Sequence, residues 1–288
     1  MSLFITSLNS GSNGNAYYVG NHEEGILIDA GISCREIERR MARLDLSMAR
    51  LRAIFISHEH SDHIQGVAVT AKKYRLPVYI TADTLRQSRL SIEKQLIVPF
   101  KPLDAVQVGG LSISAFSKRH DACDPHSFMV RSAAVNVGIF TDIGSVCPEL
   151  VRHFRECHAA FLEANYDEEM LAQGRYPAYL KGRIRGGMGH LSNTQALDLF
   201  LEHRPYYMSR LILSHLSEEN NDPALVMDLF QKHAGAIEVV VASRHKETPV
   251  FEVRADADVL SKENKPRFTR SQLQLSLFQD VFPAEQGI

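Results

Sequence analysis

The chain has 288 residues, of which 44% are hydrophobic and 23% are charged, and its formal net charge is −2. A chain of this size can bury a sizeable core in one large domain or two small ones, and its composition is that of an ordinary globular protein. The balanced charge excludes a surface that is basic throughout, so any nucleic-acid binding must use a local patch.

The first half of the chain alternates strands with helices. Residues 3–19 predict two short strands around a glycine-dependent turn at 10–15. The apolar run 25–31 predicts a buried strand with Asp29 near its end, and a helix with one apolar face follows it. The later elements are a strand over 51–56, a helix at Val67–Tyr74 and a strand at Pro77–Ile80.

The second half predicts a strand meander and then a return to alternation. Four strands are expected within residues 105–141, and a fifth at Phe161–Leu162. Residues 192–195 have the form of a capping box, which opens a helix that runs to Glu202. The remaining elements are a strand at Leu211–Ser214, a helix at Pro223–His233, and strands at Ile237–Val241 and Thr248–Val253.

This order of elements fits two mixed sheets with helices on their outer faces. The predicted fold is therefore a four-layer αββα sandwich of the α+β class, formed by residues 1–253. Polar ligands would then collect along one edge, where strand ends meet. Residues 254–270 are polar and include Pro266, so we interpret residues 254–288 as a linker and a C-terminal tail.

Nothing in the chain predicts a membrane protein or a secreted one. No apolar run approaches the ~18 residues of a membrane helix, and the N-terminal residues lack the basic and apolar regions of a signal peptide. The four cysteines show no Cys-x-x-Cys pattern. We therefore expect reduced thiols and a cytoplasmic protein.

The strongest motif is His-Glu-His-Ser-Asp-His at residues 58–63, directly after an apolar strand. Imidazole and carboxylate groups are the usual protein ligands of zinc, iron and manganese. A loop of this kind can aim His58 and His60 one way, and Asp62 and His63 another, as a two-metal site needs. The alternative interpretation is a polar surface loop that happens to contain three histidines.

Three further ligand candidates follow apolar strands. Asp142 is the best candidate for a carboxylate that bridges two metal ions, and His120 and His215 occupy similar positions after other strands. Alone, each residue is also typical of a turn or of a surface histidine. Together with the His-rich loop, they supply the ligands that a dinuclear site requires.

The motif His-x-His-x-Asp-His, with Asp29 before it and His120, Asp142 and His215 after it, resembles the metallo-β-lactamase superfamily over about residues 1–253. Shorter strings narrow the resemblance to the YycJ/WalJ branch of bacterial exonuclease-like proteins, which are related to tRNase Z. These strings are Ser10-Gly11-Ser12-x-Gly14-Asn15, His120-Asp121-Ala122-x-Asp124-Pro125, the segment 162–171 and Gly189-His190-Leu191-Ser192-Asn193.

The resemblance implies roles for the ligand candidates. One metal ion would be held by His58, His60 and His120. The other would be held by Asp62, His63 and His215, with Asp62 also counted as catalytic and Asp142 bridging the two ions. Asp29 would orient a ligand imidazole through its far nitrogen, although an Asp after a strand is also typical of a turn. Glu163 and Asn165 are candidates for the surroundings of the site, and their spacing decides no role.

Two divalent ions could share a water molecule, lower its pKa and present a bridging hydroxide as nucleophile. The positive charge of the ions suits a phosphodiester, whose transition state gains negative charge on oxygen. His190 is the candidate proton donor to the leaving alkoxide, as a similarly placed histidine is in tRNase Z-like relatives. The alternative is a solvent-facing loop histidine.

A dense basic run precedes this loop. We expect Lys181, Arg183 and Arg185 to contact the nucleic-acid backbone through its phosphates. The alternative is a solvated basic face.

The tail contains the pentapeptide Gln274-Leu275-Ser276-Leu277-Phe278. It resembles the peptides by which bacterial polymerases and repair proteins bind the sliding clamp, where Leu and Phe enter an apolar pocket. The predicted clamp contacts are Gln274, Leu275, Leu277 and Phe278. The alternative is a terminal amphipathic helix that packs on this protein, because Leu273, Leu277 and Val281 have helical spacing.

The predicted function is a metal-dependent DNA exonuclease, working 5′ to 3′ in replication-linked repair; the polarity comes from the resemblance alone. One alternative is a thioesterase, lactonase or β-lactamase on the same fold, although His63 argues against the commonest β-lactamase pattern. An RNA-processing nuclease is a second alternative, and a non-catalytic clamp-binding adaptor is a third. The sequence does not decide among zinc, manganese and iron, and it gives no oligomeric state.

Overall fold

The computed structural model of the chain describes residues 2–102 and 104–255. The candidate clamp-binding peptide 274–278 lies outside the described residues, so it stays a prediction. Among the described helices, none combines the length and apolar character needed to cross a membrane. All four cysteine thiols are free.

The first sheet has seven strands in the order β14-β1-β2-β3-β4-β5-β6. Its N-terminal part is antiparallel, whereas β3, β4, β5 and β6 run parallel. The strands are β1 (Leu3–Asn9), β2 (Ala16–Gly20), β3 (Gly25–Ile28), β4 (Leu51–Phe55), β5 (Val78–Ile80), β6 (Ile97–Pro99) and β14 (Phe251–Val253).

The second sheet mirrors this plan, in the order β13-β12-β11-β10-β9-β8-β7. Strands β7 to β10 form the predicted antiparallel meander, and β10 to β13 run parallel. The strands are β7 (Val106–Val108), β8 (Leu111–Ser117), β9 (His126–Ser132), β10 (Val135–Phe140), β11 (Ala159–Glu163), β12 (Arg210–Ser214) and β13 (Glu238–Val241).

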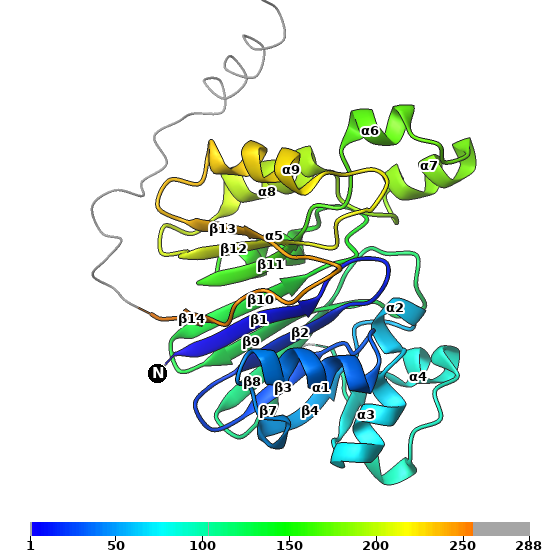
Figure 1. The fold of residues 1–288 in the computed structure, drawn as a ribbon, viewed down its shortest axis with the longest axis vertical. Coiled ribbons are helices and arrows are strands. Elements are labelled where there is room, and N and C mark those ends of the chain that lie inside the picture. The colour runs from blue at the N-terminus through cyan, green and yellow to red at the C-terminus, as the bar shows by residue number, and fades with distance from the viewer. Residues whose placement is uncertain (1, 103, 256–288) are drawn as a thin grey trace, which may run out of the picture.

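Helices cover the outer faces of both sheets, as Figure 1 shows. The first sheet is covered by α1 (Cys34–Arg43), α3 (Val67–Tyr74) and α4 (Ala82–Ser88), with α2 (Ser61–Ile64) at one end. The second sheet is covered by α5 (Pro148–Phe154), α8 (Asn193–His203) and α9 (Pro223–Gln231), while α6 (Glu168–Gln173) and α7 (Ala178–Arg185) extend beyond it. The predicted αββα sandwich is confirmed.

The apolar residues form three clusters that correspond to the three interfaces between the four layers. The central one packs the two sheets face to face through Tyr17, Phe55, Phe128 and Phe161. The outer two lie between each sheet and its helices. Burial on both faces explains why the parallel strands are apolar along their whole length.

The predicted capping box of α8 is confirmed. The Ser192 hydroxyl accepts from the backbone N–H of Gln195 at 3.1 Å, and the Gln195 side chain accepts from the N–H of Ser192 at 3.0 Å. This cap, at the second residue after His190, fixes the start of α8 at Asn193 and so restrains the backbone that presents that histidine.

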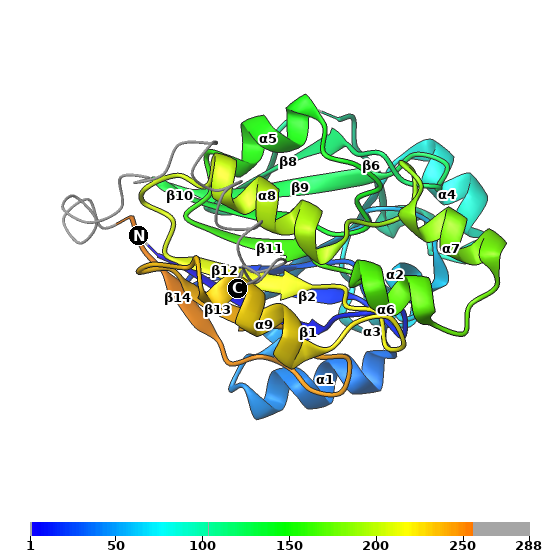
Figure 2. The ribbon, with the colours of Figure 1, turned by 90° about the horizontal axis from the view of Figure 1, so that it is seen from above.

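Helices α2, α6 and α7 gather at one end of the sandwich, whereas the N-terminus and β14 lie at the other end (Figures 1 and 2). At the α2 end, three segments of the chain meet closely around Gly31. Gly31 N–H donates to Asn15 O, and Asn15 N–H donates to Asp62 O. A Cβ at Gly31 would lie 1.6 Å from Asp62 O, so only glycine permits this approach.

Candidate metal centre

The His-rich loop begins where the buried strand β4 ends. His60 is the residue before α2, and this single turn of helix contains Asp62 and His63. The irregular backbone of 58–60 and the helical backbone of 61–64 therefore present their side chains in different directions. This is the local reason that one short motif contributes to two groups of ligands.

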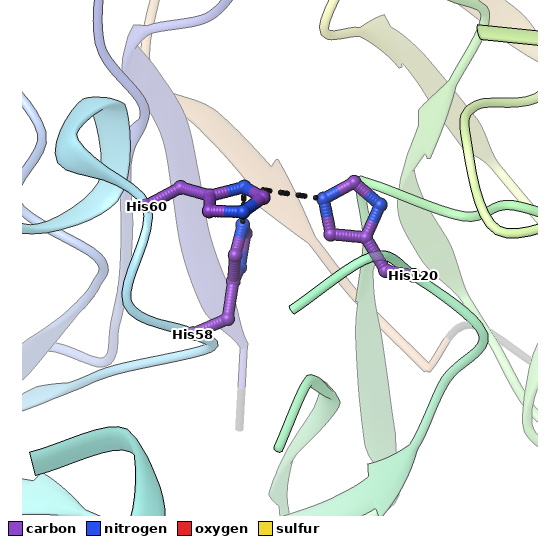
Figure 3. A group of neighbouring side chains, drawn as sticks. All are labelled: His58, His60 and His120. Atoms are coloured by element: carbon purple, nitrogen blue, oxygen red, sulfur yellow. Dashed lines mark hydrogen bonds between the residues drawn. The ribbon is translucent and has the colours of Figure 1, made fainter. Parts of the chain in front are cut away.

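The first group, called here the three-histidine group, consists of His58, His60 and His120. His58 Nε2 lies 3.1 Å from His60 Nδ1, and His120 Nε2 lies 3.3 Å from the same atom. Figure 3 shows His58 and His60 approaching from one side and His120 from the other. Three imidazole nitrogens thus face one point, at the distances a shared cation needs.

The second group, called here the carboxylate group, consists of Asp62, His63 and His215. Asp62 Oδ2 lies 3.4 Å from His63 Nε2 and 3.6 Å from His215 Nε2. Both histidines are almost fully buried. Two nitrogens and one carboxylate oxygen therefore face a second point.

Asp142 lies between the two groups. Its carboxylate is 3.2 Å from His63 Nε2, 3.4 Å from His215 Nε2 and 3.9 Å from His120 Nε2. Asp142 Oδ2 and His215 Nε2 are buried and have no hydrogen-bond partner among the described residues. Buried polar atoms without partners are costly, so these atoms, and the N/O character of the whole set, fit divalent cations.

The second ring nitrogen of most of these histidines is already engaged, which orients the ring. His63 Nδ1 donates to Asp29 Oδ2 at 2.7 Å, and His215 Nδ1 lies 3.0 Å from Glu163 Oε1. His120 Nδ1 donates to Gly189 O at 3.0 Å. In each case Nε2 is the nitrogen that faces the centre, which is how ligand histidines are held in metal sites.

The surroundings shift the pKa values of the buried histidines of the two groups in opposite directions. Burial lowers the pKa of His58 well below its ordinary value, and lowers that of His120 to about 4. Burial also opposes protonation of His63 and His215, but nearby carboxylates outweigh it. Asp142, Asp62 and Asp29 raise the pKa of His63, and Asp142, Asp62 and Glu163 raise that of His215 to about 10.

Three residues of the centre have left-handed backbone conformations. Asp29, Asp142 and His215 have φ angles of 60°, 56° and 58°. Each comes directly or almost directly after a buried strand, so the chain turns sharply at the strand end. Such conformations are unfavourable for residues other than glycine and cluster at functional sites.

Several supporting residues were not found from the sequence. Asn15 Nδ2 donates to Asp62 Oδ2 at 3.1 Å, and Ser10 Oγ accepts from the N–H of His215 at 2.8 Å. Buried Lys118 donates to Thr141 O at 2.7 Å, directly before Asp142; burial lowers its pKa. The glycine-rich string at 10–15 was the available signal for the first two, but it gave no role.

Glu163 and Asn165 both contact ligand candidates. Glu163 Oε1 lies 2.8 Å from His190 Nδ1 as well as 3.0 Å from His215 Nδ1, and Glu163 Oε2 accepts from the N–H of Ile143 at 2.6 Å. Burial opposes its ionisation, but His190 and His215 hold the pKa of Glu163 at about 2. Asn165 Nδ2 donates to His215 O at 2.7 Å.

A cavity of about 200 Å³ opens beside the centre and is lined by both His190 and His215. His190 is 21% exposed, so it is reachable from this cavity while its Nδ1 is held by Glu163. The arrangement leaves Nε2 as the nitrogen that can exchange a proton with a bound molecule.

The basic run predicted to contact nucleic acid lies in α7. Arg183 lines the cavity and pairs with Asp121, while Lys181 Nζ donates to Ala172 O at 2.7 Å. Arg185 is exposed. Only one of the three side chains therefore borders the cavity, and the DNA-binding role of the run stays a prediction.

The sequence matches the family model described as the beta-lactamase superfamily domain over residues 24–216. It is 33% identical over 226 residues to exodeoxyribonuclease YycJ of Bacillus anthracis, which covers 77% of this chain and 85% of that protein. It is 32% identical over 219 residues to exodeoxyribonuclease WalJ of Streptococcus pneumoniae, covering 74% of this chain and 81% of that protein.

Solved structures with low identity share the fold. The metallo-β-lactamase fold protein YhfI of Bacillus subtilis has a TM-score of 0.67 at 16% identity, covering 88% of this chain and 100% of YhfI. The short form of human tRNase Z has a TM-score of 0.58 at 16% identity, covering 85% of this chain and 98% of that structure. The chain therefore belongs to the metallo-β-lactamase superfamily of hydrolases, in the branch that contains YycJ and WalJ.

Proposed function

We propose that this protein is a metal-dependent exodeoxyribonuclease that uses two divalent ions. One observation carries the proposal: seven nitrogen and carboxylate donors, from stretches far apart in sequence, converge at the strand ends. Relatives named exodeoxyribonucleases, identical at about one residue in three over most of their length, support DNA as the substrate.

His58, His60 and His120 would hold one ion, and Asp62, His63 and His215 the other, with Asp142 between them. Zinc, manganese and iron all suit this N/O donor set. When bound, two such ions supply an activated water and positive charge for the phosphodiester.

The protein's own residues would complete the reaction. His190 Nδ1 is held by Glu163, so Nε2 is the atom that would give a proton to the leaving alkoxide. Because Glu163 is ionised and also holds His215, it ties the position of the proton donor to that of a ligand histidine. Asn15, through its bond to Asp62, would keep that carboxylate turned toward the centre.

The test incubates metal-reconstituted protein with single- and double-stranded DNA labelled at either end, with RNA of the same sequence, and with a thioester. We expect wild type to degrade DNA, and Asp62→Ala and His190→Ala to lose this activity. The matched control is His22→Ala, an exposed histidine outside the centre. Thioester turnover without DNA degradation would contradict the proposal, and a preference for RNA would replace its substrate.

The same experiment examines polarity. The 5′ to 3′ direction and a role in replication-linked repair are supported by the resemblance alone. Release of labelled mononucleotide first from 5′-labelled DNA is the expected result. Release first from 3′-labelled DNA would reverse the proposed direction.

We also propose a division into a catalytic domain, residues 1–253, and a tail, residues 254–288, that binds a sliding clamp. A peptide of residues 270–282 should bind the clamp at micromolar strength, and replacing Leu277 and Phe278 with Ala should abolish binding. No binding of the native peptide would contradict the clamp proposal and would leave the nuclease proposal intact.

A further inference from the structure

A second cavity, of about 370 Å³, lies next to the candidate metal centre. It shares Ser217 with the smaller cavity that contains His190 and His215. Ser10, which also lines the larger cavity, accepts the backbone N–H of His215 at 2.8 Å. The two cavities are therefore neighbours, joined at the segment that positions a ligand histidine.

The lining of this cavity combines an apolar part with a basic part, and it includes one carboxylate, Glu218. Leu216, Pro223, Val241 and Ala242 supply the apolar atoms. The basic part comes from the segment after β13, in which the cations Arg244 and Lys246 flank His245.

Arg244 lies at the boundary between the two cavities. Its side chain is only 12% exposed, and it donates to the hydroxyl of Ser12, which lines the smaller cavity, at 3.0 Å. It also pairs with Glu218, so part of its charge is already balanced. Lys246, by contrast, is exposed and has no ion-pair partner among residues 2–102 and 104–255.

The segment that presents these cations is held in place. Arg40, itself buried, donates to His245 O at 3.2 Å, and Arg43 pairs with Glu247 at 2.6 Å. Thr248 N–H donates to Ser7 O at 3.0 Å. Because the backbone is anchored to α1 and β1, little ordering of the segment would be needed when an anion binds.

We propose that this cavity is a subsite for the nucleotide adjacent to the scissile linkage. The sugar and base would lie against the apolar part, and the next phosphate along the strand would be bound by Lys246 with Arg244. This proposal rests on the proposed function, because it assumes a polymer of phosphodiesters. It identifies a basic segment other than 181–185 as the one that follows the DNA backbone.

The test compares two substrates of different length. The p-nitrophenyl ester of thymidine 5′-monophosphate contains a single phosphodiester and has no second phosphate for Lys246. A single-stranded oligodeoxynucleotide has one. The variants are Lys246→Glu and, as the matched control, Lys72→Glu, an exposed lysine of α3 that lines neither cavity.

For the oligonucleotide, Lys246→Glu should lower kcat/KM by about tenfold, the size of one lost charge-assisted hydrogen bond. The same substitution should also reduce, by ~1, the slope of the logarithm of the DNA association constant against the logarithm of salt concentration. Turnover of the p-nitrophenyl ester and all properties of Lys72→Glu should match wild type. Equal loss on both substrates, or no loss on either, would overturn the proposal.

Binding separates this proposal from the nuclease proposal. The dissociation constant of a fluorescein-labelled oligodeoxynucleotide, measured by anisotropy, should rise about tenfold in Lys246→Glu relative to wild type. If wild type binds DNA in this Lys246-dependent way but does not cleave it, the nuclease proposal fails and the DNA-binding role of the cavity stands. If Lys246→Glu binds as wild type does, the subsite is wrong, whether or not the protein cleaves DNA.

Discussion

The three-histidine group and the carboxylate group lie on either side of Asp142, yet the atoms behind them differ in charge. Behind His58 is the hydroxyl of Ser57, at 2.9 Å, and behind His120 is the carbonyl of Gly189. Behind the histidines of the carboxylate group are two buried carboxylates, Asp29 and Glu163.

This difference explains the opposite pKa shifts of the two groups. Without ions, burial disfavours protonation of His58 and His120, whereas acidic neighbours favour protonation of His63 and His215. The same field that attracts protons attracts a divalent cation. We therefore expect the carboxylate group to be the tighter of two unequal cation sites.

The largest expected effect comes from removing the residue that the two groups share. Asp142→Ala should reduce kcat/KM on DNA by at least ~10³-fold, because both ligand points lose a carboxylate and the two groups are no longer joined. Steady-state kinetics on an oligonucleotide checks this. The control is Asp228→Ala, an exposed acid on α9. Retained activity in Asp142→Ala would remove the bridging role.

The next effect concerns the carboxylate that holds two histidines. Glu163→Gln should reduce kcat/KM by roughly 10–100-fold, the usual cost of losing a group that orients a metal ligand. His190 and His215 should both be affected, so turnover and metal content should fall together. An exposed acid of α5, replaced in Glu149→Gln, provides the comparison. A change in neither property would make Glu163 a packing residue only.

A third test asks directly whether the two groups bind cations unequally. After dialysis against chelator-treated buffer, His60→Ala should keep about one ion per chain, while His215→Ala should keep fewer, with an affinity about tenfold weaker. Mass spectrometry of metal content and chelator competition measure both. Equal retention by the two variants would show that the charges behind the histidines do not rank the sites.

The smallest effect is on the stability of the metal-free protein. The folded pKa of His120, about 4, lies below its unfolded value of ~6.5, so the unfolded chain binds more protons and stability falls as pH drops from 6.5 toward 4. The folded pKa of His215, about 10, lies above its unfolded value, so stability falls as pH rises from 6.5 through 10.

The metal-free protein should thus be most stable near pH ~6.5. The midpoint of urea unfolding, plotted against pH, measures this. His120→Gln should flatten the fall of this midpoint toward acid pH, and His215→Gln should flatten its fall toward alkaline pH. If each variant changed the limb assigned to the other, the comparison between the groups would be inverted.

Much of the fold followed from sequence because burial on two faces gives long apolar runs. The helix at Val67–Tyr74 and the start of α8 were predicted to the residue. Helices α4 to α7 and strand β6 were not predicted. No residue of α7 is buried, so the helix has no apolar face to reveal it, and β6 has only three residues.

The ligand candidates were found because each follows an apolar strand, and an apolar run followed by a polar residue can be recognised in the sequence. The double role of Glu163 was not found, because it depends on β11 meeting the His190 loop and the end of β12 in space. The basic run 181–185 was noticed because its positive charges are close together in sequence. The segment after β13 that contains Arg244 and Lys246 was not noticed, because the role proposed for it depends on the cavity beside it.

The left-handed backbone at Asp29, Asp142 and His215 has a consequence for anyone who engineers this protein for heat resistance. Glycine relaxes such a conformation at no steric cost, and asparagine tolerates it better than most residues. A screen for higher melting temperature alone would therefore favour glycine or asparagine at these three positions. The most thermostable clones of such a library would be depleted in catalysts, because each of these three unfavourable turns positions a residue of the metal centre.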